Sequence, residues 1–318
     1  MHSDDDALPD QSTAAASEAA PIESPATARA PFPAWSWFAI GAAAAVFGLL
    51  PWLVTGARLP LQNLWGSETM PEDMPRTLLP FSQYFLQSVA ALLGIGAVAS
   101  GIAFRALRAR AGRHARLALV LGVVVVQGVA LVQTTVVVAN GLRGDADSAL
   151  YLSVIGGAAL VSFVAGLVVL PFVAWGPRAG ALIGLTLAAL MVSSWVGTAL
   201  DPVALSVTNA YTWLSPILRW TPPVLVGLAI AWCGLATAGR IVAAVCSLLL
   251  LWVIPALATG VAYAFGSRVL LYDPSSIGGA LVDVARMALL QPALVLPHLV
   301  VAIGVAALGL ALRRARSR

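Results

Sequence analysis

The sequence predicts an all-α fold: a polytopic integral membrane helical bundle of about eight transmembrane helices, with both termini cytoplasmic. Hydrophobic residues make up 60% of the 318 residues and charged residues only 10%, whereas a soluble domain carries about 25% charged residues. Mean hydropathy is +0.90. Apolar stretches near the roughly 20 residues that a spanning helix needs recur from Ala34 to Leu312.

The first 33 residues differ in composition from the rest of the chain. They hold six acidic residues with Ala, Ser and Pro, and almost no large apolar residue before Phe32. Such a segment cannot bury enough apolar surface to offset the entropy of ordering, so we expect a disordered acidic tail over 1–33. No basic stretch precedes the first apolar run, which argues against a secretory signal. Docking onto a partner, or onto the chain's own arginine loop, is the alternative role.

The apolar stretches that follow the tail predict eight spans. Because a backbone in lipid must satisfy its polar groups within each segment, the spans are expected to be helices. Pro51, Pro171 and Pro255 are expected to kink or end theirs. The expected helices cover 34–55, 81–104, 117–140, 151–176, 181–200, 221–239, 241–265 and 293–312, within a membrane domain over 34–312 and before a basic cytoplasmic C-terminus over 313–318.

Arginines and acidic residues separate between the two sides of the predicted bundle. One set of connections (105–116, the loop at Arg178, the turn at Arg240 and the C-terminal RRARSR) holds eleven arginines and no Asp or Glu. The other set holds six arginines and eight acidic residues, and it consists of 56–80, 141–150, 201–220 and 266–292. The positive-inside rule places the first set in the cytoplasm. We therefore expect a bacterial plasma-membrane protein with both termini on the cytoplasmic side.

The arginine loop over 105–116 is interpreted as a topology anchor with contact to anionic lipid, where each basic side chain adds about 1 kcal/mol. It has no aromatic residue on which a base could stack and no accompanying soluble domain, so we expect no nucleic-acid partner. All 18 basic residues of the chain are arginine, a bias that favours a GC-rich coding genome such as an actinobacterial one. The anchoring residues are Arg105, Arg108, Arg110, Arg113 and Arg116.

Three of the four outer connections run to about 20 residues or more and contain amphipathic or aromatic stretches. In 277–290, five apolar or small residues recur at helical spacing, a pattern typical of an interfacial helix lying on the outer leaflet. Those residues are Ile277, Leu281, Val284, Ala285 and Leu289.

No Asp, Glu, Lys or Arg lies near the middle of any predicted span. A charge there costs at least about 2.5–3.5 kcal/mol and usually marks an ion or proton route. This absence argues against a proton-coupled antiporter and a voltage sensor. His298 is the only histidine of the spans, so we expect no intramembrane metal and no haem or other cofactor.

Neutral polar residues in the spans have two interpretations. They form helix–helix contacts, in which a hydrogen bond between two helices stabilises the pair by about 0.6 kcal/mol, or they line a cavity for a neutral or amphipathic molecule. Glutamines clustered in the second and third spans favour the cavity slightly, because packing alone needs only small residues. The candidate substrate-binding residues are Gln83, Gln87, Gln127, Gln133, Thr134, Ser193 and His298.

Three function classes remain open from the sequence. The leading hypothesis is a transport-related permease or a membrane subunit of an export or envelope assembly. A non-catalytic scaffold or accessory subunit that binds other membrane subunits is the second. The third is an envelope enzyme whose outer acid–base residues would be Glu68, Glu72, Asp73, Asp273, Asp283 and His298.

The predicted orientation is checked by cysteine labelling in intact cells. A cysteine placed in 266–292 is expected to react with a membrane-impermeant reagent from outside, because that segment follows an odd-numbered span of a chain that starts inside. Labelling only from the cytosol would overturn the topology.

Overall fold

The computed structural model of this chain describes residues 30–200, 210–267 and 274–316. These residues form nine α-helices and no β-strand, and eight of the helices are long and apolar enough to span a membrane. The predicted all-α polytopic bundle is therefore confirmed. The helices are α1 (Ala34–Val54), α2 (Leu86–Leu107), α3 (Ala115–Gly141), α4 (Ala146–Ala174), α5 (Arg178–Ala199), α7 (Ala210–Cys233), α8 (Ala238–Gly266), α10 (Pro274–Leu289) and α11 (Pro292–Arg316).

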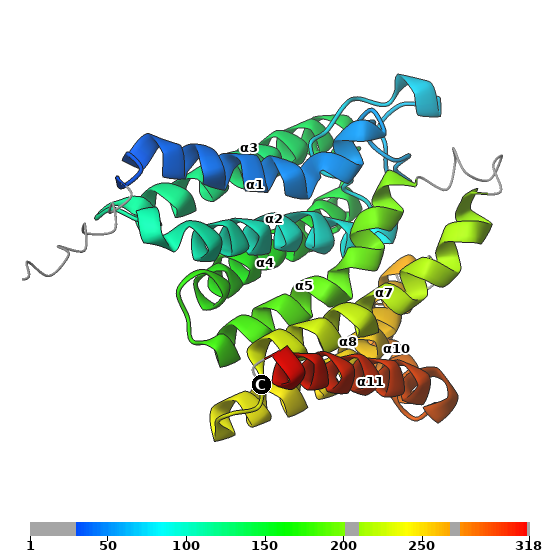
Figure 1. The fold of residues 1–318 in the computed structure, drawn as a ribbon. Helices are drawn as coiled ribbons and strands as arrows, with labels where there is room; N and C mark the ends of the chain where they lie inside the picture. Colours follow the sequence, from blue (N-terminus) through cyan, green and yellow to red (C-terminus); the bar gives the residue numbers. More distant parts are fainter. Residues whose placement is uncertain (1–29, 201–209, 268–273, 317–318) are drawn as a thin grey trace, which may run out of the picture. The chain divides into compact units, whose positions relative to one another are not determined.

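Helix α5 joins two groups of helices (Figure 1). In the first group α1 packs on α2 and α3, and α2 packs on α4. In the second group α7 packs on α11, and α8 packs on α10. Because α5 contacts α2 and α4 of the first group as well as α7 and α8 of the second, it connects the two groups.

Glycines bring α1 and α3 into backbone contact. A Cβ atom at Gly41 would overlap the carbonyl oxygen of Leu119, and one at Gly122 would overlap the carbonyl oxygen of Phe38. Small residues allow this approach, and within lipid such close packing replaces the hydrophobic effect as the source of helix association. The crossing of α1 and α3 therefore depends on the absence of side chains at both positions.

The opposite face of α3 is apolar and exposed. Val and Leu residues recur there three or four positions apart, as on one face of a helix. In water an apolar patch of this extent would drive association, whereas lipid tails solvate it. The exposed residues are Leu117, Leu121, Val125, Val129, Val132 and Val136.

The helix bounds agree with the prediction to within a few residues, except in the sixth span. That span was expected over 221–239 with 201–220 as a connection, and this is wrong, since α7 runs from Ala210 to Cys233. Pro216, Pro222 and Pro223 lie inside it. Proline interrupts a helix only where the freed carbonyl lacks another donor, and in α7 a neighbouring helix supplies one. The three prolines that were expected to kink or end their spans also lie inside helices.

The helix expected over 277–290 is α10, which packs along α8. Ala285 is buried, and it lies 3.0 Å from the position of a Cβ atom at Gly260. The indole of Trp252 donates a hydrogen bond of 3.1 Å to the carbonyl oxygen of Leu289. Part of α10 therefore packs on α8, while Val282, Met287 and Leu290 remain exposed. The interfacial position of this helix stays a prediction.

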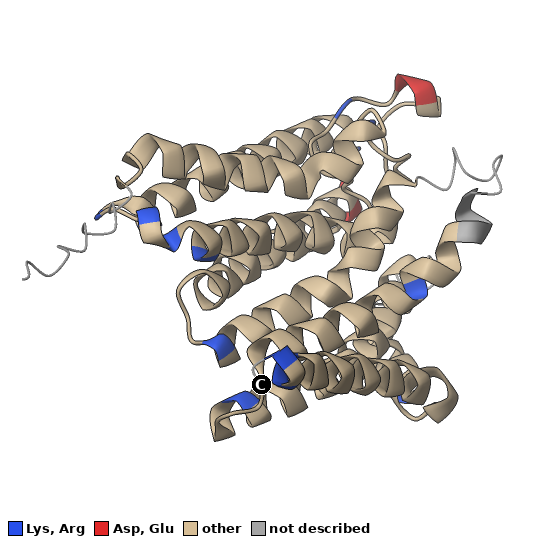
Figure 2. Cartoon of the chain, in the orientation of Figure 1, with Lys and Arg blue, Asp and Glu red and all other residues tan. Residues whose placement is uncertain are grey.

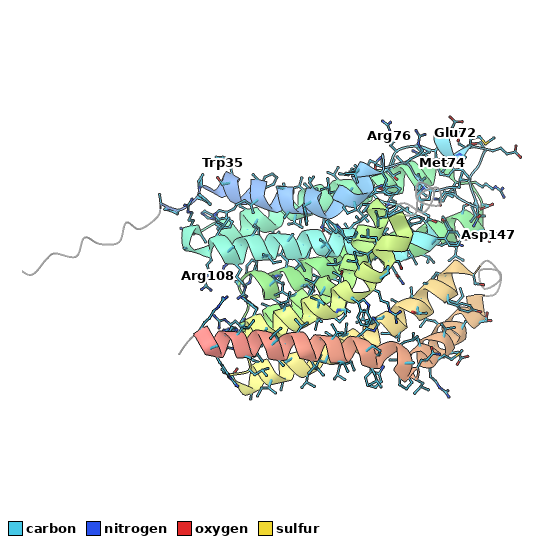
Figure 3. The ribbon with its side chains drawn as sticks, turned by 45° about the vertical axis from the view of Figure 1, so that its right-hand side comes forward. Trp35, Glu72, Met74, Arg76, Arg108 and Asp147 are labelled. Carbon is cyan, nitrogen blue, oxygen red and sulfur yellow. The ribbon has the colours of Figure 1, made fainter. Side chains whose placement is uncertain are left out.

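Charge separates between the two ends of the helices (Figure 2). The described arginines of 105–116, Arg178, Arg240 and the C-terminal turn of α11 lie at one end, and no described Asp or Glu accompanies them. The acidic residues of the connections after α1 and α3 lie at the other end, where Figure 3 labels Glu72 and Asp147. The assignment of the arginine end to the cytoplasm stays a prediction.

Adding one methyl group on α3 tests the glycine contact. Gly122→Ala is expected to destabilise the bundle by about 1–3 kcal/mol, because the new Cβ atom forces α1 and α3 apart. Gly128→Ala on the same helix has no atom within 4 Å of the added carbon, and it is expected to be neutral or to stabilise by about 0.5–1 kcal/mol. Thermal unfolding in detergent measures both variants, and equal melting temperatures would contradict the role of Gly122.

Candidate functional site

A cavity of 920 Å³ lies where α5, α7, α8 and α11 meet the start of α2. Its volume falls in the range of about 300–1,000 Å³ that is typical of small-molecule sites. Its apolar lining includes Leu190, Leu251, Trp252, Leu294 and Val295.

Two proline interruptions border the cavity. Pro222 removes the amide hydrogen that would bond the carbonyl of Leu218, four residues earlier, and Pro255 does the same to Leu251. The hydroxyl of Ser193 on α5 donates a hydrogen bond of 2.6 Å to the freed Leu218 carbonyl. The freed carbonyl of α7 is therefore satisfied from α5, and α7 and α8, which stay helical through their prolines, each contribute lining residues there.

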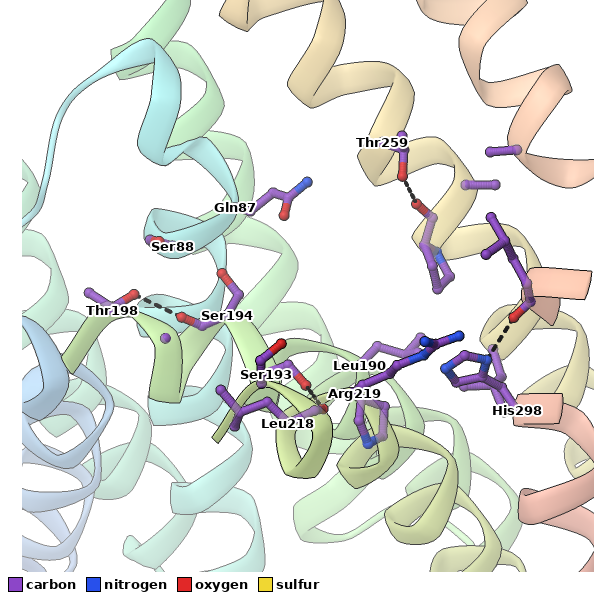
Figure 4. A pocket seen from close by; sticks show the side chains of 18 of the residues that line it. Gln87, Ser88, Leu190, Ser193, Ser194, Thr198, Leu218, Arg219, Thr259 and His298 are labelled. Carbon is purple, nitrogen blue, oxygen red and sulfur yellow. Dashed lines mark hydrogen bonds between the residues drawn. The ribbon is translucent and has the colours of Figure 1, made fainter. Parts of the chain in front are cut away.

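Hydroxyl and amide side chains of α2 and α5 form one wall (Figure 4). Gln87 spans to α8, where its amide nitrogen donates to the Ala258 carbonyl at 2.8 Å. Ser88, Ser194 and Thr198 line the same wall. This wall can hydrogen-bond a polar group, while the apolar residues named above can hold an apolar one.

Arg219 and His298 lie on the opposite wall (Figure 4). The His298 ring stacks on Trp220 with centroids 5.0 Å apart, and its Nδ1 atom lies 2.7 Å from the Leu294 carbonyl oxygen. The Arg219 guanidinium lies over the same Trp220 ring, 5.6 Å from its centroid. Arg219 was expected in the connection over 201–220, but it lies inside α7.

Arg219 is the one arginine among the described lining residues, and none of those residues is a carboxylate. The side chains of Glu68, Glu72, Asp73 and Asp283 are exposed and do not line the cavity. Asp273 lies outside the described residues. The acid–base set expected for an envelope enzyme is thus not brought together with His298 in the part of the chain that the structure describes.

Gln127 lies in a helix–helix contact and not in the cavity. Its side chain is fully buried, and its amide nitrogen donates to the Leu93 carbonyl at 2.8 Å. Gln83 is also buried, in the short 3₁₀ turn before α2, and does not line the cavity. Gln127 thus bonds across to α2, whereas the buried amide group of Gln83 has no hydrogen-bond partner among the described residues.

Gln133 and Thr134 hold the connection over 56–80 against α3. Gln133 accepts a hydrogen bond of 2.9 Å from the Leu78 amide and donates one of 3.0 Å to the Arg76 carbonyl. The Thr134 hydroxyl accepts one of 3.0 Å from the Leu79 amide. These contacts satisfy backbone groups of a segment without regular structure. Of the seven candidate binding residues, the cavity therefore gathers three: Gln87, Ser193 and His298.

The five arginines of the loop over 105–116 contact neighbouring elements in different ways. The Arg105 guanidinium donates to the carbonyls of Val173 and Gly176 at 2.5 and 2.6 Å, which caps the end of α4. Arg110 lies 4.7 Å from the Phe32 ring centroid and Arg116 lies 5.5 Å from that of Trp175. Arg108 and Arg113 line a second cavity, described below.

Within residues 30–200, 210–267 and 274–316, no three His, Cys, Asp or Glu side chains are placed to share a metal ion. Comparison of the chain with protein-family models, curated proteins and solved structures found no match. Functional interpretation therefore depends on the geometry of the chain itself.

Removing the side-chain partners on α3 is expected to release the outer connection. Gln133→Leu with Thr134→Val leaves the amides of Leu78 and Leu79 without acceptors, and each loss costs about 1–3 kcal/mol. Hydrogen exchange in a peptide covering 77–80 should then speed up by about tenfold or more. Thr135→Val is the control, because that hydroxyl bonds only the Leu131 carbonyl of its own helix. Unchanged exchange in the double variant would contradict the anchoring role.

Proposed function

We propose that this multi-pass membrane protein is transport-related, a permease or the membrane subunit of an export or envelope assembly, and that it takes an amphipathic molecule into the 920 Å³ cavity. The observation that carries the proposal is the two-sided lining: a polar wall with one guanidinium group and an apolar wall, within an apolar bundle. Gln87, Ser193 and Thr198 already donate to backbone carbonyls, so the oxygen atoms of these side chains remain as acceptors for a polar group of the bound molecule.

The charge of the lining favours a neutral or anionic head over a cationic one. The only arginine of the described lining is Arg219, and no described carboxylate offsets it. An anionic head bound there forms a charge-assisted hydrogen bond, roughly twice as strong as a neutral one. The apolar part of the molecule then packs against residues such as Leu190 and Leu251.

Prolines inside the helices around the cavity support a transport role. Proline-containing spans are one indication of a transporter's binding site, because freed backbone groups lie there. Here Pro222 and Pro255 line the cavity inside continuous helices, and the Ser193 hydroxyl bonds one freed carbonyl. A substrate group that replaced the hydrogen bond between Ser193 and the Leu218 carbonyl would loosen α5 from α7. Substrate binding would then change the angle between these two helices.

The transport proposal is tested in liposomes with a fluorescent (NBD-labelled) lysophosphatidylglycerol as the probe. Its movement between leaflets is read from the fraction that membrane-impermeant dithionite bleaches. The wild-type protein should accelerate this movement relative to protein-free liposomes. Arg219→Gln should slow the protein-dependent part by about tenfold, since it removes one charge-assisted hydrogen bond.

Two matched controls separate cavity effects from general ones. Arg286→Gln makes the same charge change at an exposed residue of α10 that does not line the cavity. Gln87→Leu removes the hydrogen bond to the Ala258 carbonyl and should also slow the movement; Ser153→Leu on α4 is its control, because Ser153 is exposed and bonds only its own helix. Wild-type movement at the protein-free rate, or equal slowing by Arg219→Gln and Arg286→Gln, argues against the proposal.

A further inference from the structure

A second cavity, of 460 Å³, lies at the arginine end of the bundle, between the α2–α3 loop and the end of α4. Four arginines line it, together with aromatic and small residues, and no described carboxylate does. Its volume is within the range of about 300–1,000 Å³ that small-molecule sites occupy. The four arginines are Arg105, Arg108, Arg113 and Arg116.

The four guanidinium groups differ in what they contact. Arg105 is held by the carbonyls at the end of α4, and Arg116 lies over the Trp175 ring. The side chains of Arg108 and Arg113 form no hydrogen bond or ion pair with any described residue. Among the described residues, these two groups therefore leave their donors unbonded in a cavity that the other two have already made positive.

The local backbone adds to this positive charge. Helix α3 begins at Ala115, directly after the loop that lines the cavity, and the first turn of a helix carries partial positive charge. The opposite partial charge, at the end of α4, is already capped by Arg105. Four like charges around one cavity repel one another, and an anion bound among them relieves that repulsion.

We infer that this arginine cavity binds a phosphate group, with Arg108 and Arg113 as the two mobile donors and Arg105 and Arg116 as fixed charges. Guanidinium groups match the oxygens of a phosphate in bidentate geometry. The apolar side of the cavity, formed by Phe104, Ala174 and Trp175, fits the glycerol and first methylenes of a phospholipid. A free phosphate offers the same oxygens without that apolar part.

Binding is measured with delipidated protein in detergent, by native mass spectrometry against added phosphatidylglycerol. Arg108→Gln with Arg113→Gln should weaken phosphatidylglycerol binding by about tenfold or more, because charge-assisted hydrogen bonds are lost. Arg240→Gln with Arg316→Gln removes the same net charge at the same end, outside the cavity, and should change binding less than threefold. Arg108→Lys with Arg113→Lys keeps the charge and should recover part of the affinity, which shows that the glutamine variant lost binding and not its fold.

A second arm distinguishes a lipid headgroup from a soluble phosphate. The melting temperature of each variant is measured without phospholipid, in inorganic phosphate and in chloride of equal ionic strength. One outcome assigns the site to a soluble phosphate: inorganic phosphate raises the melting temperature of every protein except the cavity variant, while all variants bind phosphatidylglycerol equally. Equal phosphatidylglycerol binding in cavity and control variants, together with no phosphate-dependent stabilisation, overturns the inference. Because Arg219 lies outside this cavity, the outcome is independent of the transport proposal.

Discussion

Hydrogen bonding of the backbone within an apolar environment is the constraint on which this structure depends. Each carbonyl that loses its helical donor must find another, because no water replaces it inside lipid. Pro222 frees the Leu218 carbonyl, and the Ser193 hydroxyl of another helix bonds it at 2.6 Å. A carbonyl of α7 that its own helix does not bond is therefore satisfied by α5, beside the 920 Å³ cavity.

The same constraint explains the contacts made by many polar side chains of the bundle. Gln87 and Gln127 each donate to a carbonyl of a neighbouring helix. At the arginine end, Arg105 donates to carbonyls at the end of α4, and Arg313 donates to the carbonyls of Ala231 and Trp232 near the end of α7, at 2.5 and 2.8 Å. Arginines at this end thus serve as helix caps as well as surface charges, which is a structural use that charge counting does not detect.

The two cavities lie in different surroundings and call for different ligands. The larger one has a single arginine, hydroxyl and amide groups, and a long apolar wall, and it lies between the two groups of helices. The smaller one has four arginines and lies at one end of the helices. A head with one charge and an apolar tail fits the first, whereas a compact anion with several oxygens fits the second. The charge of the larger cavity, Arg219, lies inside α7 (Ala210–Cys233), which corrects the expectation that it belongs to a connection.

The number of spans and most of their bounds follow from composition and length, because burial in lipid imposes apolar runs of a fixed size. The separation of arginines from acidic residues between the two ends can also be predicted from the sequence.

The role of each polar residue cannot be predicted in this way, since it depends on which carbonyl of another helix lies within hydrogen-bond distance. Gln127 and Gln87 have the same chemistry, yet one is buried against α2 and the other lines a cavity. Arg219 was assigned to a connection for a similar reason: the donor that keeps α7 helical past its prolines comes from Ser193, 25 residues before the carbonyl that it bonds. Local sequence therefore sets the helices, and packing between helices selects the residues that form the site.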